Sequence, residues 1–255
     1  MRREPKLTFR IIRRCAFDCP LCSTFSGVKR RGEMRQSDFR AAMDILATCD
    51  FRGTLNVSGG ETTLHGRLCS MLRYASVRLP LARIAVFTNG DWVGRPGWRR
   101  RLRRMLAGPN VLVRFSLDRQ HAQGAIRGAG RKITRKRLEA AERNRLRQAG
   151  QFLDACLASG AKPGVNFDFA FKGTADEARA YMRDLGPVPV YTIRLRRDPD
   201  KRPKEPGFFA VDAQENGSPL VYPTLGHIPR GEHMGGLETL ATALEINRRS
   251  LERLR

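Results

Sequence analysis

The sequence predicts an α/β fold in which short buried strands alternate with longer amphipathic helices. Short apolar runs rich in Val, Ile and Phe recur along the 255 residues, and an amphipathic stretch follows most of them. Strands that alternate with helices in this way pair in parallel through right-handed crossovers. We therefore expect parallel strands that form a barrel or an open curved sheet.

Six strands are predicted, at residues 7–12, 54–58, 84–88, 111–116, 165–171 and 190–195. Helical patterns lie between them at residues 37–48, 67–79, 97–107, 134–159 and 174–185. Ser37 and Thr174 are the expected caps of the first and the last of these helices, because acidic residues follow each of them in the first turn. Together these elements predict a partial, TIM-like (β/α)6 barrel over residues 1–197.

The last part of the chain departs from this alternation. Residues 198–236 include "DPDKRPKEPGFF" and "PTLGHIPRGEHMGG", which are rich in Pro and Gly and predict an irregular segment or a lid. Leucines spaced along residues 237–254 predict a final amphipathic helix. We expect residues 198–255 to cover the barrel as part of the same domain.

The composition limits the class of protein. No run of 18 apolar residues is present, so we expect no membrane span, and the basic N-terminus lacks a signal-peptide cleavage site. Six cysteines, three of them clustered, indicate metal chemistry in a reducing cytoplasm rather than disulfides. The net charge of +23 suits nucleic acid, an acidic redox protein or an anionic small molecule as partner, or it is a compositional bias on solvated helix faces.

Cys15, Cys19 and Cys22 follow the first predicted strand and supply three thiolates. A structural zinc site needs a fourth ligand, which Cys49, Cys69 or a histidine would have to provide. A [4Fe–4S] cluster held by three thiolates instead leaves one iron open to an external ligand, and that arrangement suits catalysis.

Polar or glycine-rich segments also follow the next three strands. They read "SGGETTL", "FTNG" and "FSLDRQH". Catalytic groups of parallel barrels lie at the carboxyl ends of the strands, so these segments are expected to share one edge of the sheet. Glycines let a ligand approach the backbone closely. The candidate residues at these strand ends are Ser58, Gly59, Gly60, Glu61, Thr88, Asn89, Ser116, Asp118 and His121.

The order of these motifs, CxxxCxxC, GGE, TNG and SLD after successive strands, resembles that of the radical S-adenosylmethionine (radical SAM) enzymes over about residues 6–197. The resemblance implies that Cys15, Cys19 and Cys22 bind three irons of a [4Fe–4S] cluster and that the methionyl end of SAM chelates the fourth.

It also implies contacts to SAM. Residues 58–61 would receive the methionyl amino group of SAM. Ser116 and Asp118 would contact its ribose or carboxylate, and Arg127 of "IRGAG" would pair with its carboxylate. Thr88 and Asn89 count among the expected cofactor-binding positions. Phe17 and Leu21, inside the cysteine loop, suit packing near the cluster and adenine or only shield the cluster.

The substrate residues are less sharply indicated. Period-two alternation sends Asn166 and Asp168 to one face of their strand, and Arg194 to one face of the next. Facing inward, Asp168 and Arg194 would serve a polar or anionic substrate. Facing outward, they would form salt bridges with helices. His121 is the third candidate catalytic residue, whereas Cys156 is expected to pack inside its helix.

The expected function is reductive cleavage of SAM to a 5′-deoxyadenosyl radical that abstracts hydrogen from a small polar substrate, with anionic substrates included, in specialised metabolite biosynthesis. The enzyme would be oxygen-sensitive and would take electrons from an acidic donor such as flavodoxin or ferredoxin. One alternative substrate is a macromolecule: RNA, a peptide or a glycyl-radical protein. The best basic segment, residues 131–148, lacks aromatic residues for base stacking, so nucleic acid is not favoured. A non-catalytic metal-binding module is the alternative of another class.

Overall fold

The computed structural model describes residues 6–20, 22, 24, 26–193, 208–213, 219–225, 228–229 and 235–244. Its strands are β1 (Lys6–Ile12), β2 (Thr54–Gly59), β3 (Arg83–Thr88), β4 (Val111–Ser116), β5 (Phe167–Lys172), β6 (Val190–Ile193), β7 (Phe208–Ala213), β8 (Pro219–Leu225) and β9 (Ile228–Pro229). Its α-helices are α1 (Gln36–Thr48), α2 (Leu68–Arg78), α3 (Trp98–Met105), α4 (Arg119–Gly128), α5 (Arg135–Ala158) and α6 (Ala175–Tyr181). Short 3₁₀ helices are η1 (Thr62–Leu64), η2 (Arg183–Leu185) and η3 (Leu237–Thr239).

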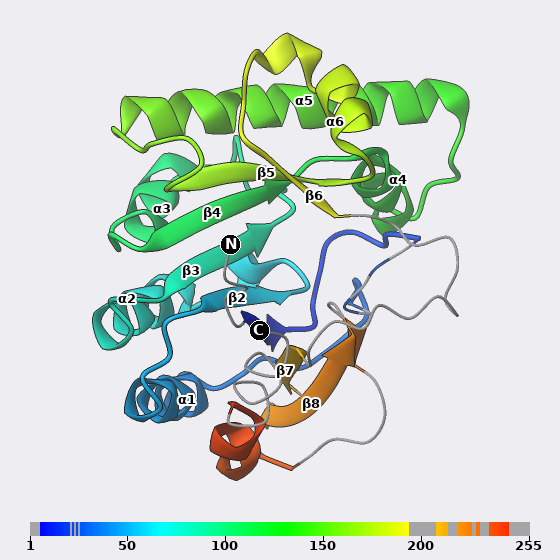
Figure 1. The fold of residues 1–255 in the computed structure, drawn as a ribbon. Helices are drawn as coiled ribbons and strands as arrows, with labels where there is room; N and C mark the ends of the chain where they lie inside the picture. The colour runs from blue at the N-terminus through cyan, green and yellow to red at the C-terminus, as the bar shows by residue number, and fades with distance from the viewer. Residues whose placement is uncertain are drawn as a thin grey trace.

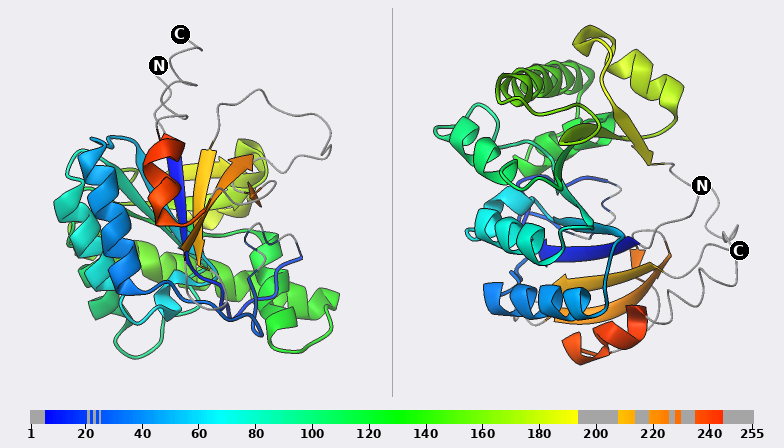
Figure 2. Two further views of the ribbon diagram at one scale, coloured as in Figure 1. Left: turned by 90° about the horizontal axis from the view of Figure 1, so that it is seen from below. Right: turned by 60° about the vertical axis from the view of Figure 1, so that its left-hand side comes forward.

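All nine strands form one curved sheet in the order β6-β5-β4-β3-β2-β1-β7-β8-β9, with helices along its face (Figures 1 and 2). Neighbouring strands from β1 to β6 pair in parallel, with β1 against β2 and each later strand against the next. The predicted α/β fold and partial TIM-like barrel are therefore confirmed. No helix of the described residues is long and apolar enough to cross a membrane.

Alternate residues of the strands serve two different faces. Phe9, Val57, Val113 and Phe169 have no exposed surface and belong to the apolar core against the helices. The ring of Phe152 on α5 completes this core, with its centroid 5.1 Å from that of Phe115 on β4. The intervening positions on the other face are mostly polar. Thr8, Arg10, Asn56 and Ser58 line a cavity there, so the period-two pattern that builds the core also builds a polar chamber.

Three features differ from the prediction. Part of the supposedly irregular segment forms β7, which pairs in parallel with β1, and β8, which pairs antiparallel with β7. Strand β8 was not predicted because it contains Pro219 and Pro223, and proline lacks the backbone donor that a strand uses. Helix α4 was missed because its two glycines lower helix propensity.

The helix caps were half right. Thr174 caps α6 in a capping box with Glu177, as predicted. Ser37 does not cap α1, because the helix already begins at Gln36. Its N-cap is Arg35, whose side chain makes no capping hydrogen bond. Of the predicted final helix, η3 and the α-helical residues 240–244 are described, and residues 245–254 lie outside the described part.

Candidate functional site

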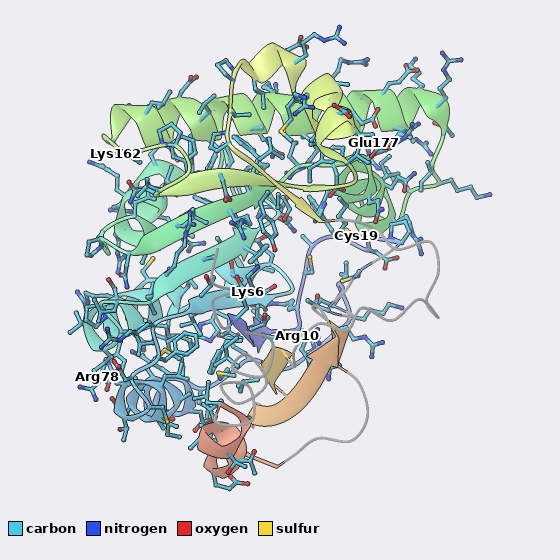
Figure 3. The ribbon with its side chains drawn as sticks, in the orientation of Figure 1. Lys6, Arg10, Cys19, Arg78, Lys162 and Glu177 are labelled. Atoms are coloured by element: carbon cyan, nitrogen blue, oxygen red, sulfur yellow. The ribbon has the colours of Figure 1, made fainter. Side chains whose placement is uncertain are left out.

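The three clustered cysteines line one cavity at the carboxyl edge of the parallel strands. Figure 3 labels Cys19 on the segment that leaves β1, beside α4. The same cavity is lined by residues from the ends of β2, β3 and β4, and these are Ser58, Gly59, Gly60, Thr88, Asn89 and Ser116. The predicted meeting of the cysteine loop with three strand ends is therefore what the fold produces.

The two glycines of the GGE segment allow this meeting. A Cβ atom on Gly59 would overlap the carbonyl oxygen of Ile12, and one on Gly60 would overlap that of Arg14. Gly60 N donates to Ile12 O (2.6 Å), and Glu61 N donates to Arg14 O (3.0 Å). The backbone that leads into Cys15 therefore lies directly against residues 59–61, and no larger side chain fits there.

Helix α4 approaches the cysteine loop equally closely. A Cβ atom on Gly124 would overlap Cys19 Sγ, and one on Gly128, one turn later, would overlap Ala16 O. Asp18 N donates to Gly124 O at 2.9 Å. Gly124 and Gly128, which lower the helix propensity of α4, thus form the helix face that contacts the cysteine loop.

Glu61 does not face the cavity, although it was expected to lie beside a ligand. Its side chain is buried and accepts hydrogen bonds from Thr63 N (3.1 Å), Thr63 Oγ1 (2.6 Å), Thr88 Oγ1 (2.7 Å) and Asn89 N (2.7 Å). Burial raises the pKa of this carboxyl, and the hydrogen bonds oppose that rise. Glu61 therefore joins the end of β2 to the end of β3 and positions its neighbours.

Asn89 is held with its amide toward a cysteine. Asn89 Nδ2 donates to Cys15 Sγ at 3.4 Å, while Oδ1 accepts from Asp91 N at 2.9 Å. Thr88 Oγ1, besides donating to Glu61, accepts from Trp92 Nε1 at 2.8 Å. Asn89 thus contacts the cysteine set itself, which is a more specific placement than the turn signal in the sequence indicated.

Asp118 and His121 form a carboxylate–imidazole pair at the end of β4. Asp118 caps α4 by accepting from His121 N (2.9 Å), and its Oδ1 lies 2.8 Å from His121 Nδ1. Burial would raise the pKa of Asp118, but the charge and hydrogen bonds of His121, with the charge of Lys172, outweigh it and lower that pKa to about 2. Asp118 is therefore ionised, so Nδ1 donates. His121 and Lys172 both line the cavity.

The Asp118–His121 pair predicts a pH-dependent stability. Because the folded pKa of about 2 lies below the ordinary aspartate value of 3.8, the ionised carboxyl stabilises the fold by about 2 kcal/mol above pH 4. Asp118→Asn keeps a capping oxygen but removes the charge, so it should lose this stability at pH 7. The difference from the parent should shrink as the pH falls from about 4 to 2. Urea unfolding of both proteins across this range measures it, and a pH-independent difference would contradict the assignment.

Asp168 is engaged by an arginine from the neighbouring strand. Arg114 Nε donates to Asp168 Oδ1 (2.8 Å) and Nη2 donates to Oδ2 (2.6 Å), and both side chains are only 8% exposed. The Arg114 guanidinium also lies 3.8 Å from the ring centroid of Tyr191 and 5.1 Å from that of Phe87. This is a salt bridge between strands, which neither sequence-based alternative had foreseen.

Other predicted positions are less central. Arg127 Nε lies 3.3 Å from Asp18 Oδ2 in a half-exposed ion pair, and Arg127 does not line the cavity. Phe17 is buried and lines the cavity. Leu21 and Arg194 lie outside the described residues. Cys156, on α5, is buried in the apolar core, as expected.

Arg145 is a buried residue of the site that sequence reasoning missed. It is 1% exposed, and from α5 its Nη2 donates to Ser116 O at 2.8 Å. Its guanidinium lies 5.4 Å from the ring centroid of Phe17 in the cysteine loop. Burial lowers its pKa to about 10, with nearby carboxylates such as Glu61 opposing the change. One buried arginine within a helix of many exposed ones carries no distinguishing sequence signal.

Thr24 is a second missed residue, and it connects the cysteine loop to the GGE segment. Its Oγ1 lies 3.3 Å from Cys22 Sγ and donates to Gly59 O at 2.8 Å. A threonine two residues after the last cysteine gives no signal beyond its proximity to that cysteine.

Cys15, Cys19 and Cys22 are the residues of the site that could hold a metal centre. Three thiols line one cavity, yet no three His, Cys, Asp or Glu side chains of the described residues converge on one ion position. Burial raises the pKa of Cys15 and Cys19 to about 12, so thiols that bind metal there would release protons. Asn89 and Thr24 add polar contacts at the sulfurs, as supporting residues of metal centres do.

No family model matches the chain. No curated protein matches it either. Solved structures do match. anSMEcpe with bound AdoMet has a TM-score of 0.60 and 14% sequence identity, covering 97% of this chain and 83% of that one. SuiB of Streptococcus suis bound to S-adenosylmethionine has a TM-score of 0.53 and 10% identity, covering 94% and 65%. Both are radical SAM enzymes, and the chain described here has their fold.

Proposed function

We propose that the chain is a radical SAM enzyme that cleaves SAM reductively at a [4Fe–4S] cluster and abstracts hydrogen from a small polar, anionic substrate. The observation that carries this proposal is the convergence of Cys15, Cys19 and Cys22 with the ends of β2, β3 and β4 on one cavity. The fold shared with two SAM-bound enzymes supports it.

Cys15, Cys19 and Cys22 would hold the cluster, and the backbone at residues 58–60 with Ser116 would face SAM. When bound, the cluster supplies the electron that splits SAM into methionine and a 5′-deoxyadenosyl radical. The residues of the chain orient the reactants, and Glu61 and Arg145 fix the strand ends that do so.

The charge of the cavity supports an anionic substrate. Arg10, His121 and Lys172 line it, whereas neither Glu61 nor Asp168 does. Of these, the guanidinium of Arg10 and the ammonium of Lys172 are groups that bind carboxylate or phosphate. His121 Nδ1 donates its proton to a hydrogen bond with Asp118, so Nε2 is the nitrogen that can exchange a proton with a substrate.

A peptide substrate is the second candidate function. A structure titled anSMEcpe with bound AdoMet and Cp18Cys peptide matches the chain with a TM-score of 0.50 and 17% identity, covering 80% of this chain and 54% of that one. The two candidates differ in the compounds that should raise 5′-deoxyadenosine yield in the reconstituted protein. We expect small carboxylates or phosphate esters to raise it and unrelated cysteine- or serine-containing peptides to leave it unchanged. The reverse pattern would favour the peptide.

The contact from Asn89 to Cys15 predicts a shift in the cluster potential. Hydrogen bonds to the ligating sulfurs stabilise the reduced, more negative cluster. Asn89→Ala should therefore make the midpoint potential more negative. Redox titration followed by electron paramagnetic resonance measures it. Asn56→Ala, a change of the same kind at a cavity residue whose Nδ2 bonds to Thr8 Oγ1, should leave the potential unchanged, and equal shifts in both would contradict the assignment.

A further inference from the structure

Two exposed basic turns adjoin the cysteine loop. The first, residues 28–31, is fastened to it because Cys15 N donates to Gly27 O (3.2 Å) and Arg13 N donates to Gly32 O (2.9 Å). The second, residues 129–134, follows directly from α4, the helix that packs on Cys19 and Ala16. Figures 1 and 2 show the segment after β1 beside α4 and the start of the loop that leads to α5.

We call the exposed cations of these two turns the basic rim, and they are Lys29, Arg30, Arg31, Arg131 and Lys132. None of the five forms an ion pair with another described residue, whereas the nearby Arg127 and Arg135 pair with Asp18 and Glu139. Neither turn contains an acidic residue. The rim thus gathers five cations that form no ion pair with the part of the chain that the structure describes.

Each turn also exposes one aliphatic side chain. Val28 is 49% exposed and Ile133 is 41% exposed. Charge at such a surface steers the encounter with a partner of opposite charge, and these two side chains would add apolar contact area.

We propose that the basic rim is the docking surface of an acidic one-electron carrier protein. This inference rests on the proposed function, because a cluster at Cys15, Cys19 and Cys22 needs an external electron. The rim lies on the two segments fastened to those cysteines, so a protein bound there brings its redox group near the cluster. A nucleic acid is the less favoured occupant, since neither turn has an aromatic residue for base stacking.

The test uses an acidic flavodoxin as the probe and a pair of triple variants. The rim variant carries Arg30→Glu, Arg31→Glu and Arg131→Glu. The control variant carries Arg73→Glu, Arg100→Glu and Arg103→Glu, which make the same change in net charge on exposed positions of α2 and α3. Flavodoxin affinity is measured calorimetrically at low and high salt, and cluster reduction by reduced flavodoxin or by dithionite is followed by absorbance.

We expect the rim variant to weaken flavodoxin binding by about tenfold or more and to slow flavodoxin reduction of the cluster in proportion. Dithionite reduction should be unaffected, and the control should match the parent. Equal losses in both variants, a loss with dithionite as well, or rim-dependent binding of an RNA oligonucleotide with none of flavodoxin would each overturn the docking surface. Lack of bound iron would instead contradict the proposed function, and the affinity measurement would still decide the docking.

Discussion

Gly124→Ala is expected to weaken binding of the proposed [4Fe–4S] cluster without unfolding the protein. The added methyl group would overlap Cys19 Sγ, and the nearest loop backbone is as close as 3.1 Å, so the cysteine must move away. Changes in residues that support metal ligands weaken metal binding by about 10–100-fold. Iron and sulfide per chain after anaerobic reconstitution, with the visible absorbance of the cluster, measure the effect.

The matched control is Gly150→Ala in α5. Its new methyl group would meet only Leu185 Cδ2 at 3.8 Å, which is an ordinary contact. Because alanine is the better helix former, this variant should be as stable as the parent or more stable by about 1 kcal/mol, with full iron content. A Gly124→Ala protein that retains all its iron would show that α4 does not position Cys19.

Arg114→Met is expected to destabilise the fold by about 3–5 kcal/mol, the cost of leaving a buried partner charge uncompensated. Asp168 would remain almost fully buried after losing both of its guanidinium hydrogen bonds. The double variant Arg114→Met with Asp168→Leu removes both charges and should recover most of that loss. Denaturant unfolding of the parent, the two single variants and the double variant measures the coupling.

The same four proteins test whether Asp168 also acts on substrate. If the pair only supports the sheet, the double variant should recover SAM cleavage along with stability. A stable double variant with no substrate-dependent cleavage would assign Asp168 or Arg114 to the reaction. A double variant as unstable as Arg114→Met would contradict the ion-pair account.

The strand ends were predictable because three physical signals coincided there. Alternating hydrophobicity marked the strands, parallel pairing brought their carboxyl ends to one edge, and glycine and polar residues marked that edge. These signals account for the shared edge at which Cys15, Cys19 and Asn89 lie.

What the sequence did not reveal depends on contacts between distant segments. The role of Glu61 is set by Thr88 and Asn89 at the end of the next strand, and that of Asp168 by Arg114 across a strand pair. Helix α4 has weak local propensity because Gly124 and Gly128 serve the close approach of another segment. At these positions the local sequence pattern disagrees with the contacts that the fold requires, and the tertiary contacts determine the structure.

The most direct test of the account is anaerobic reconstitution with iron and sulfide, followed by dithionite and SAM and by chromatography for 5′-deoxyadenosine. We expect a brown protein that forms 5′-deoxyadenosine, and a Cys19→Ala variant that forms none while Cys49→Ala, at an exposed cysteine outside the cavity, behaves as the parent. A colourless protein that binds one zinc ion and leaves SAM intact would contradict the account and favour a non-catalytic metal-binding module.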